Sequence, residues 1–106
     1  MRGPVLDAVI IGAGPAGLTA AVYLARFRRR VAVLDGGASR ASWIPVSYNL
    51  IGFPDGLGGK HLLDRLQVQA RQYGADIIPG QVDRLERSGD GFAIFIGCRT
   101  IRALRA

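Results

Sequence analysis

Three glycines and one acidic residue in the first third of the chain have the spacing of a dinucleotide site. Gly12, Gly14 and Gly17 form a G-x-G-x-x-G pattern, and Asp35 follows after about 20 residues. Without a side chain at Gly14 the backbone can approach a pyrophosphate, and a carboxylate accepts hydrogen bonds from a ribose. These residue types predict binding of a diphosphate-linked ligand. An acid at position 35, in place of an arginine, argues against a 2′-phosphate on its ribose.

The elements around these residues support the pattern. Residues 7–11 are a short β-branched run, which predicts a strand buried on both faces. Pro15 suits the first turn of a helix, because its φ is fixed and it has no N–H, and residues 16–27 continue as good helix formers. A second buried strand over 31–34 ends at Asp35. The order predicts a βαβ unit in which the start of the helix directs N–H groups at the glycine turn, although Asp35 could also be a simple turn residue.

The rest of the chain predicts one more helix and several short strands. Between residues 39 and 59 there is little periodicity, and a loop of that length in a small domain is usually functional or disordered. We expect a helix over 60–73, ended by Gly74, and a third parallel strand over 75–78. An antiparallel β-meander is expected over residues 82–87, 92–96 and 100–104. The predicted fold class is α/β, a Rossmann-like βαβ domain of residues 1–106 with a parallel sheet and a small meander.

Composition limits the classes of protein that fit. A chain of 106 residues with 49% hydrophobic and 21% charged residues predicts one small globular domain. No apolar stretch approaches the ~20 residues of a membrane helix, and Asp7 interrupts the only run that resembles a signal peptide. Cys98 is the single cysteine, so an internal disulfide is excluded, and no Cys/His spacing predicts a metal site. We therefore expect a cytoplasmic protein.

The basic character of the chain has a structural interpretation. The formal net charge is +6, and the densest cluster is Arg26 with residues 28–30. This cluster lies at the predicted end of a helix, where cations interact favourably with the helix dipole. Arg99, Arg102 and Arg105 are spaced through an apolar stretch and fit the solvated side of a strand. We therefore expect neither nucleic acid nor a membrane as a partner.

Beyond the glycine pattern, the sequence resembles a known family over essentially its whole length. The resemblance is carried by GAGPAGL at 12–18, DGG at 35–37, YNLIGF at 48–53 and DGLGG at 55–59. Together these segments look like the FAD-binding half of the thioredoxin reductase family of flavoproteins. The N-x-x-G-F segment before a helix is the most characteristic of them.

The resemblance implies FAD as the cofactor and assigns its contacts. Asp35 would bind the ribose, Asn49 would lie at the flavin end, and the backbone of Val82 would reach the adenine, although Val82 could equally be an ordinary strand residue. The full set of predicted cofactor contacts is Gly12, Gly14, Pro15, Ala16, Gly17, Asp35, Gly36, Ser39, Arg40, Asn49 and Val82. No residue is predicted to be catalytic and none to bind a metal.

The resemblance also implies parts of the family that these residues do not supply. Family members carry an NAD(P)H-binding domain and transfer a hydride from NAD(P)H to the flavin, and the redox Cys-x-x-Cys of thioredoxin reductases lies in that domain. We therefore expect an incomplete relative that lacks activity by itself. We also expect the edge of strand 7–11 to be unpaired, so that the chain forms a homodimer or self-associates. A simple NAD-binding module and a non-catalytic interaction fragment remain as alternatives.

Overall fold

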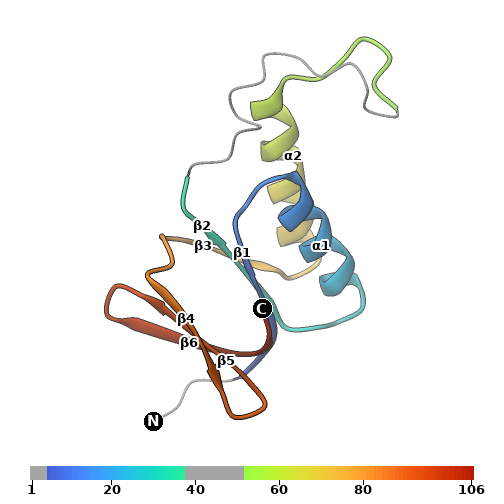
Figure 1. The fold of residues 1–106 in the computed structure, drawn as a ribbon. Helices are drawn as coiled ribbons and strands as arrows, with labels where there is room; N and C mark the ends of the chain where they lie inside the picture. Colours follow the sequence, from blue (N-terminus) through green and yellow to red (C-terminus); the bar gives the residue numbers. More distant parts are fainter. Residues whose placement is uncertain (1–4, 38–51) are drawn as a thin grey trace.

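The computed structural model describes residues 5–37 and 52–106, and these ranges contain two helices and six strands. The bounds of the strands are β1 Leu6–Ile11, β2 Val31–Asp35, β3 Asp76–Pro79, β4 Arg84–Ser88, β5 Gly91–Ile96 and β6 Arg99–Arg105. The helices are α1, Pro15–Arg26, and α2, Gly59–Gln72 (Figure 1). Every predicted element is present with bounds within two residues of those expected.

The six strands form one sheet in the order β3-β2-β1-β6-β5-β4. The pairs β1–β2 and β2–β3 are parallel, and β4–β5 and β5–β6 are antiparallel. The predicted α/β class, with a Rossmann-like parallel portion and an antiparallel meander, is therefore confirmed. The joint between the two portions is β6, which pairs with β5 on one side and in parallel with β1 on the other.

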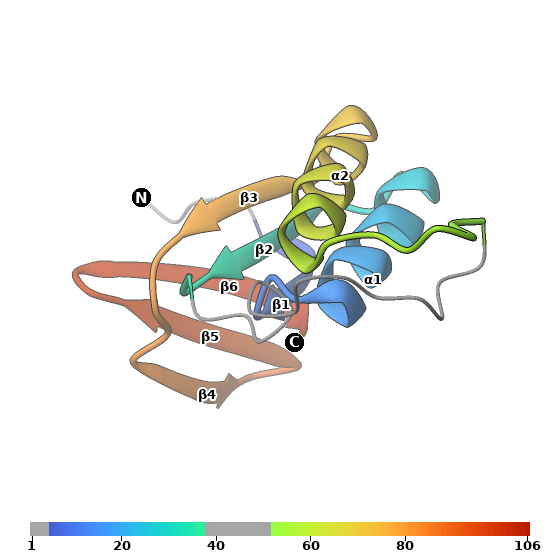
Figure 2. The ribbon, with the colours of Figure 1, turned by 90° about the horizontal axis from the view of Figure 1, so that it is seen from above.

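Helices and meander cover opposite faces of the parallel strands. Figure 2 shows α1 and α2 together beside β1, β2 and β3, with the β4–β6 meander on the other side. The helix side contains one buried cluster, in which Leu18, Ala21 and Val33 are fully buried. The meander side contains a second cluster, which includes Val9 and Ile94. Apolar side chains of the parallel strands thus point alternately toward the helices and toward the meander, as expected for strands that are covered on both faces.

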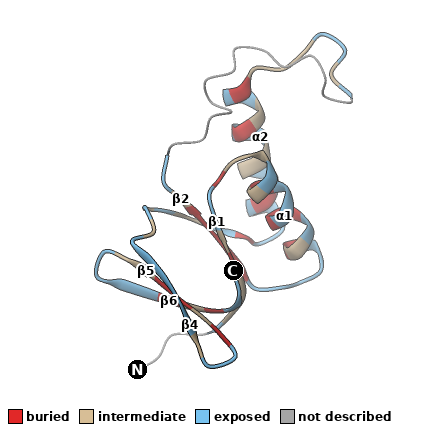
Figure 3. Cartoon of the chain, viewed as in Figure 1, coloured by how far each residue is buried: buried red, intermediate tan, exposed pale blue. Residues whose placement is uncertain are grey.

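The second strand, β2, is the most buried element. Four of its five residues are buried and only Asp35, at its carboxyl end, is partly accessible (Figure 3). Its register aligns Val33 with Ile10 of β1 and with Ile77 of β3. Because β1, β2 and β3 run in parallel, their carboxyl ends lie at the same edge of the sheet. This edge is where side chains and turns after the strands can converge.

The predicted open edge of β1 is partly wrong. Leu6 pairs with Ala103 and Ala8 with Arg105, so β6 occupies half of the edge that we expected to be unpaired. The prediction failed because it treated the meander as separate from the parallel strands, whereas β6 pairs with β5 of the meander and also with β1. In the described ranges, the segment Val9–Ile11 has no partner on that side.

A smaller difference concerns the start of the meander. The strand expected from Val82 begins at Arg84. Directly before it, the Asp83 N–H donates to the Phe95 carbonyl oxygen at 2.8 Å, and the Asp83 carboxylate accepts from the Gly97 N–H at 2.6 Å. Val82 therefore lies in the connection between β3 and β4.

The basic cluster lies where the sequence predicts it. Arg26 is the last residue of α1, and Arg28, with φ of 60°, takes the left-handed conformation just after the helix.

Neither of the two described helices is long and apolar enough to cross a membrane.

Candidate functional site

The turn after β1 depends on Gly12 and Gly17. Gly12 has φ of 107°, which L side chains rarely adopt, and its N–H donates to the Leu34 carbonyl oxygen at 3.0 Å. A Cβ on Gly17 would overlap the carbonyl oxygen of Gly12 and lie 3.0 Å from Ile10 Cγ2. Helix α1 therefore begins directly against the end of β1, which it could not do with a side chain at position 17.

The start of α1 leaves backbone N–H groups available. Gly14 is the residue before the helix, and no side chain there or nearby caps it. Pro15 has no N–H, and the first intrahelical bond runs from the Leu18 N–H to the Gly14 carbonyl oxygen at 2.9 Å. The N–H groups of Ala16 and Gly17 precede it, and such groups at a helix start favour an anion. Within residues 5–37 and 52–106 no side chain caps this end of α1, so it can accept a phosphate.

The carboxylate of Asp35 is held in place from two directions. Its Oδ1 accepts a hydrogen bond from the Gly37 N–H at 2.8 Å, which closes a turn around Gly36. Its Oδ2 accepts from Nε2 of Gln67 on α2 at 3.4 Å. Each oxygen keeps a lone pair for a ligand hydroxyl, since an ionised carboxylate offers about four acceptor sites. Asp35 is thus oriented before any ligand binds.

These features meet at one hollow of about 280 Å³ at the carboxyl ends of β1, β2 and β3. Five sequence-predicted residues line it, namely Gly12, Gly14, Asp35, Gly36 and Val82. Pro15, Ala16 and Gly17 form the first turn of α1 next to it and are not among its lining residues. Ser39, Arg40 and Asn49 lie outside the described residues.

Sequence reasoning missed Gly80, Gln81 and Gln67. Gly80 and Gln81 line the hollow, and the Gly80 N–H donates to the Asp35 carbonyl oxygen at 2.8 Å, which ties the end of β3 to the end of β2. The position of Gln81 directly after a parallel strand was a usable signal, because the carboxyl ends of such strands form ligand sites. Nothing in the local pattern marked Gln67, whose contact with Asp35 arises only from the packing of α2.

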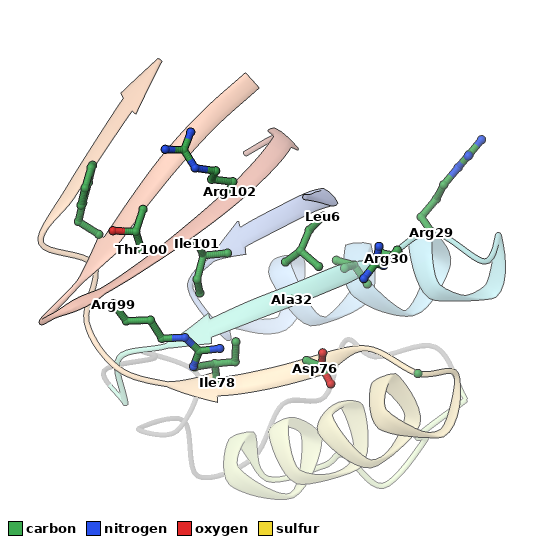
Figure 4. A pocket seen from close by; sticks show the side chains of 13 residues that line it. Leu6, Arg29, Arg30, Ala32, Asp76, Ile78, Arg99, Thr100, Ile101 and Arg102 are labelled. Carbon is green, nitrogen blue, oxygen red and sulfur yellow. The ribbon is translucent and has the colours of Figure 1, made fainter. Parts of the chain in front are cut away.

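A larger hollow of about 720 Å³ lies between the meander and β1–β3, and it includes the amino-terminal residues of the parallel strands. Figure 4 shows its apolar wall at Leu6, Ala32 and Ile78, with Arg99 extending toward Ile78 and Asp76 on the wall of β3. None of the predicted contacts lines it. Since ligands of parallel sheets bind at the carboxyl ends of strands, we place the candidate site at the glycine turn.

The described residues contain no metal-ligand cluster. No group of three or more His, Cys, Asp or Glu side chains gathers in the ranges 5–37 and 52–106. Cys98 is exposed in the turn between β5 and β6 and is not among the residues that line the hollow. What the site offers is a set of hydrogen-bonding groups suited to holding a ligand.

Comparison with known proteins identifies the class. The sequence model of the family described as pyridine nucleotide-disulphide oxidoreductase matches residues 6–94, which include the glycine turn, Asp35 and the start of the meander. The chain belongs to this family of oxidoreductases.

Its curated relatives are thioredoxin reductases. The chain is 37% identical to the thioredoxin reductase of Streptomyces coelicolor over 89 residues, which are 81% of this chain and 28% of that protein. It is 33% identical to the thioredoxin reductase of Streptomyces clavuligerus over 105 residues, which are 96% of this chain and 33% of that protein. The chain thus spans about a third of the length of these relatives.

Solved structures agree. The atypical thioredoxin reductase of Desulfovibrio vulgaris Hildenborough superposes with a TM-score of 0.86 at 35% identity, over 94% of this chain and 34% of that one. The thioredoxin reductase of Streptococcus pyogenes gives a TM-score of 0.88 at 28% identity, over 96% of this chain and 34% of that one. The fold described above therefore matches about a third of each of these two structures.

Proposed function

We propose that this chain is the FAD-binding portion of an NAD(P)H-dependent flavoprotein oxidoreductase of the thioredoxin reductase type. The observation that carries the proposal is the convergence of three parts on one hollow: the glycine turn, the uncapped start of α1 and the oriented carboxylate of Asp35. Similarity to proteins named thioredoxin reductases over nearly the whole chain supports the choice of FAD.

The residues present fit a dinucleotide. The space left by Gly17 brings the start of α1 against the end of β1, and the N–H groups of Ala16 and Gly17 are suited to the pyrophosphate. We assign Asp35 to the hydroxyls of the adenosine ribose and the backbone of Val82 to the adenine, and both residues line the hollow. A bound flavin would supply two-electron redox chemistry, which the side chains do not provide.

The part played by the chain itself is to bind and orient. The N–H groups at the start of α1 neutralise the charge of a diphosphate, and Asp35 fixes the sugar at the end of β2. No described side chain is placed as an acid, base or nucleophile at the hollow. In the proposed enzyme, NAD(P)H and the electron acceptor would bind to parts that correspond to the portion of these relatives outside the matched third.

A plain NAD-binding module is the competing proposal, since the glycine turn and Asp35 would serve it equally. An absorbance spectrum separates the two. We expect the purified chain to retain a yellow flavin spectrum after incubation with FAD and desalting, and NADH to leave the protein on the same column. Retention of NADH without FAD would favour the NAD-binding module, and retention of neither would contradict the proposed function.

The variant Gly14→Val tests the phosphate assignment. Gly14 has φ of −81° and ψ of −177°, an extended conformation that valine adopts readily, so the fold should survive. The added side chain would stand at the hollow where the diphosphate must approach. We expect FAD retention to fall below detection while the far-UV circular dichroism stays unchanged. Equal FAD affinity in the variant would show the assignment to be wrong.

A further inference from the structure

The connection between β3 and β4 is a fixed arm over the candidate site. At one end the Gly80 N–H donates to the Asp35 carbonyl oxygen, and at the other the Asp83 N–H donates to the Phe95 carbonyl oxygen, each at 2.8 Å. Only Gln81 and Val82 lie between these two anchors, and both line the hollow. Their positions are therefore set by the sheet on either side.

The side chain of Gln81 turns toward the turn that contains Asp35. Its Oε1 lies 3.8 Å, and its Cδ 3.9 Å, from the point where a β-carbon on Gly36 would stand. Gly36 is the residue enclosed by the hydrogen bond between the Asp35 carboxylate and the Gly37 N–H. The amide of Gln81 and the carboxylate of Asp35 thus flank the same glycine.

We propose that Gln81 is a second sugar contact and that it binds, together with Asp35, the vicinal hydroxyls of an adenosine ribose. The proposal rests on the proposed function of the site as a binding site for FAD. A carboxylate only accepts hydrogen bonds, whereas an amide both donates and accepts. The two groups together satisfy a diol more fully than the acid alone, and a sugar that lacks a hydroxyl loses one partner.

The turn at Gly36 and the Gln81 amide lie within contact distance of each other. A β-carbon at position 36 would stand 3.8 Å from Gln81 Oε1, which is an ordinary van der Waals distance. The amide is therefore close enough to the Asp35 turn for both to reach one sugar. The specificity of the site for a ribose, as opposed to a deoxyribose, follows from Gln81 and Asp35 jointly.

The test is a binding cycle with ADP, 2′-deoxy-ADP and 3′-deoxy-ADP on the full chain, measured by isothermal titration calorimetry. We expect Gln81→Ala to weaken ADP binding by about fivefold to tenfold, the effect of one hydrogen bond. One of the two deoxy ligands should bind the parent chain more weakly by a similar factor and should bind Gln81→Ala without further loss, because the lost hydroxyl and the lost amide are partners. Gln69→Ala, an exposed glutamine on α2, is the matched control and should leave all three affinities unchanged.

The outcomes separate this proposal from the function of the site. If Gln81→Ala weakens the binding of ADP and of both deoxy ligands by equal factors, or weakens none of them, Gln81 is not a sugar contact. Retention of FAD by the parent chain would in that case still support the proposed function. FAD binding without measurable ADP binding would also overturn it, because the sugar would not then contribute. If the parent chain binds neither FAD nor ADP, both proposals fail. An unchanged melting temperature of Gln81→Ala shows that the affinity change is local.

Discussion

The acid at the end of β2 shows what a single residue contributes and what it needs from others. Asp35 was predictable from the sequence because a carboxylate about 20 residues after a glycine turn has a chemical use that depends only on its position in a βαβ unit. Its orientation was not predictable. The Gly37 N–H is local, but Gln67 is 32 residues away and reaches the carboxylate only because α2 packs where it does. The local sequence therefore identified the Asp35 carboxylate, but it did not identify Gln67 as the residue that helps to orient it.

The first prediction at this scale concerns Asp35 itself. We expect Asp35→Ala to weaken ADP and FAD binding by at least about tenfold, since hydrogen bonds to a charged group contribute about 1.5–3 kcal/mol each. Fluorescence titration of FAD measures the effect. Asp90→Ala removes an exposed carboxylate in the turn between β4 and β5, which does not line the hollow, and it should leave the affinity unchanged. Equal FAD affinity in the parent and in Asp35→Ala would contradict the ribose assignment.

The second prediction concerns Gln67. Its bond to Asp35 is long, at 3.4 Å, so its loss should matter less than the loss of the acid. We expect Gln67→Ala to weaken FAD binding by about twofold to fivefold, in line with a net contribution near the lower end for a hydrogen bond. In the background of Asp35→Ala, the change at Gln67 should have no effect on affinity, because Gln67 acts through Asp35. Additive losses in the double variant would show that Gln67 touches the ligand or acts elsewhere.

At the scale of elements, apolar runs and periodicity, together with glycine and proline signals at their ends, were sufficient to place all helices and strands of the described ranges. The buried run of β2 and the helical spacing of α2 are strong local signals. Strand pairing is different in kind, because it depends on residues far apart in the chain. The pairing of Ala8 with Arg105 joins the first strand to the last. The local pattern of residues 99–105 is the same whether this strand pairs only with β5 or also with β1, so the sequence could not predict the second pairing.

The contact between α1 and β1 gives a prediction with a diagnostic sign. In most helices Gly→Ala stabilises by up to about 1 kcal/mol. At Gly17 the added β-carbon would overlap the carbonyl oxygen of Gly12, so we expect Gly17→Ala to lower the free energy of unfolding by about 1–3 kcal/mol. Urea denaturation measures it. The comparison variant Ala20→Gly, at an exposed position of α1, should lose about 1 kcal/mol by helix propensity alone. A stabilised Gly17→Ala variant would mean that α1 does not depend on this close approach.

At the scale of the whole molecule, the sheet has edges that differ in how well they resist pairing with another chain. The outer strand β4 is exposed and charged, with Arg84 and Glu86 forming an ion pair at 2.9 Å, and charged edges disfavour strand addition. The other outer strand, β3, carries Asp76 at its start and Pro79 at its end, and proline cannot donate to a ladder. The vulnerable place is the inner segment Val9–Ile11, which β6 leaves without a partner in the described ranges.

This segment predicts how the chain behaves in solution. Ile11 is 47% exposed beside backbone groups that have no strand partner on the β6 side, so we expect the isolated chain to self-associate as its concentration rises. Sedimentation velocity over a concentration series measures the share of monomer. Ile11→Lys places a charge at this edge and should raise that share, whereas Leu85→Lys, at an equally exposed apolar position on β4, should not. A single monomeric species at every concentration, with a cooperative thermal melt, would contradict this expectation, because three unpaired residues between β6 and the carboxyl end of β1 would then be too short an edge to recruit a second chain.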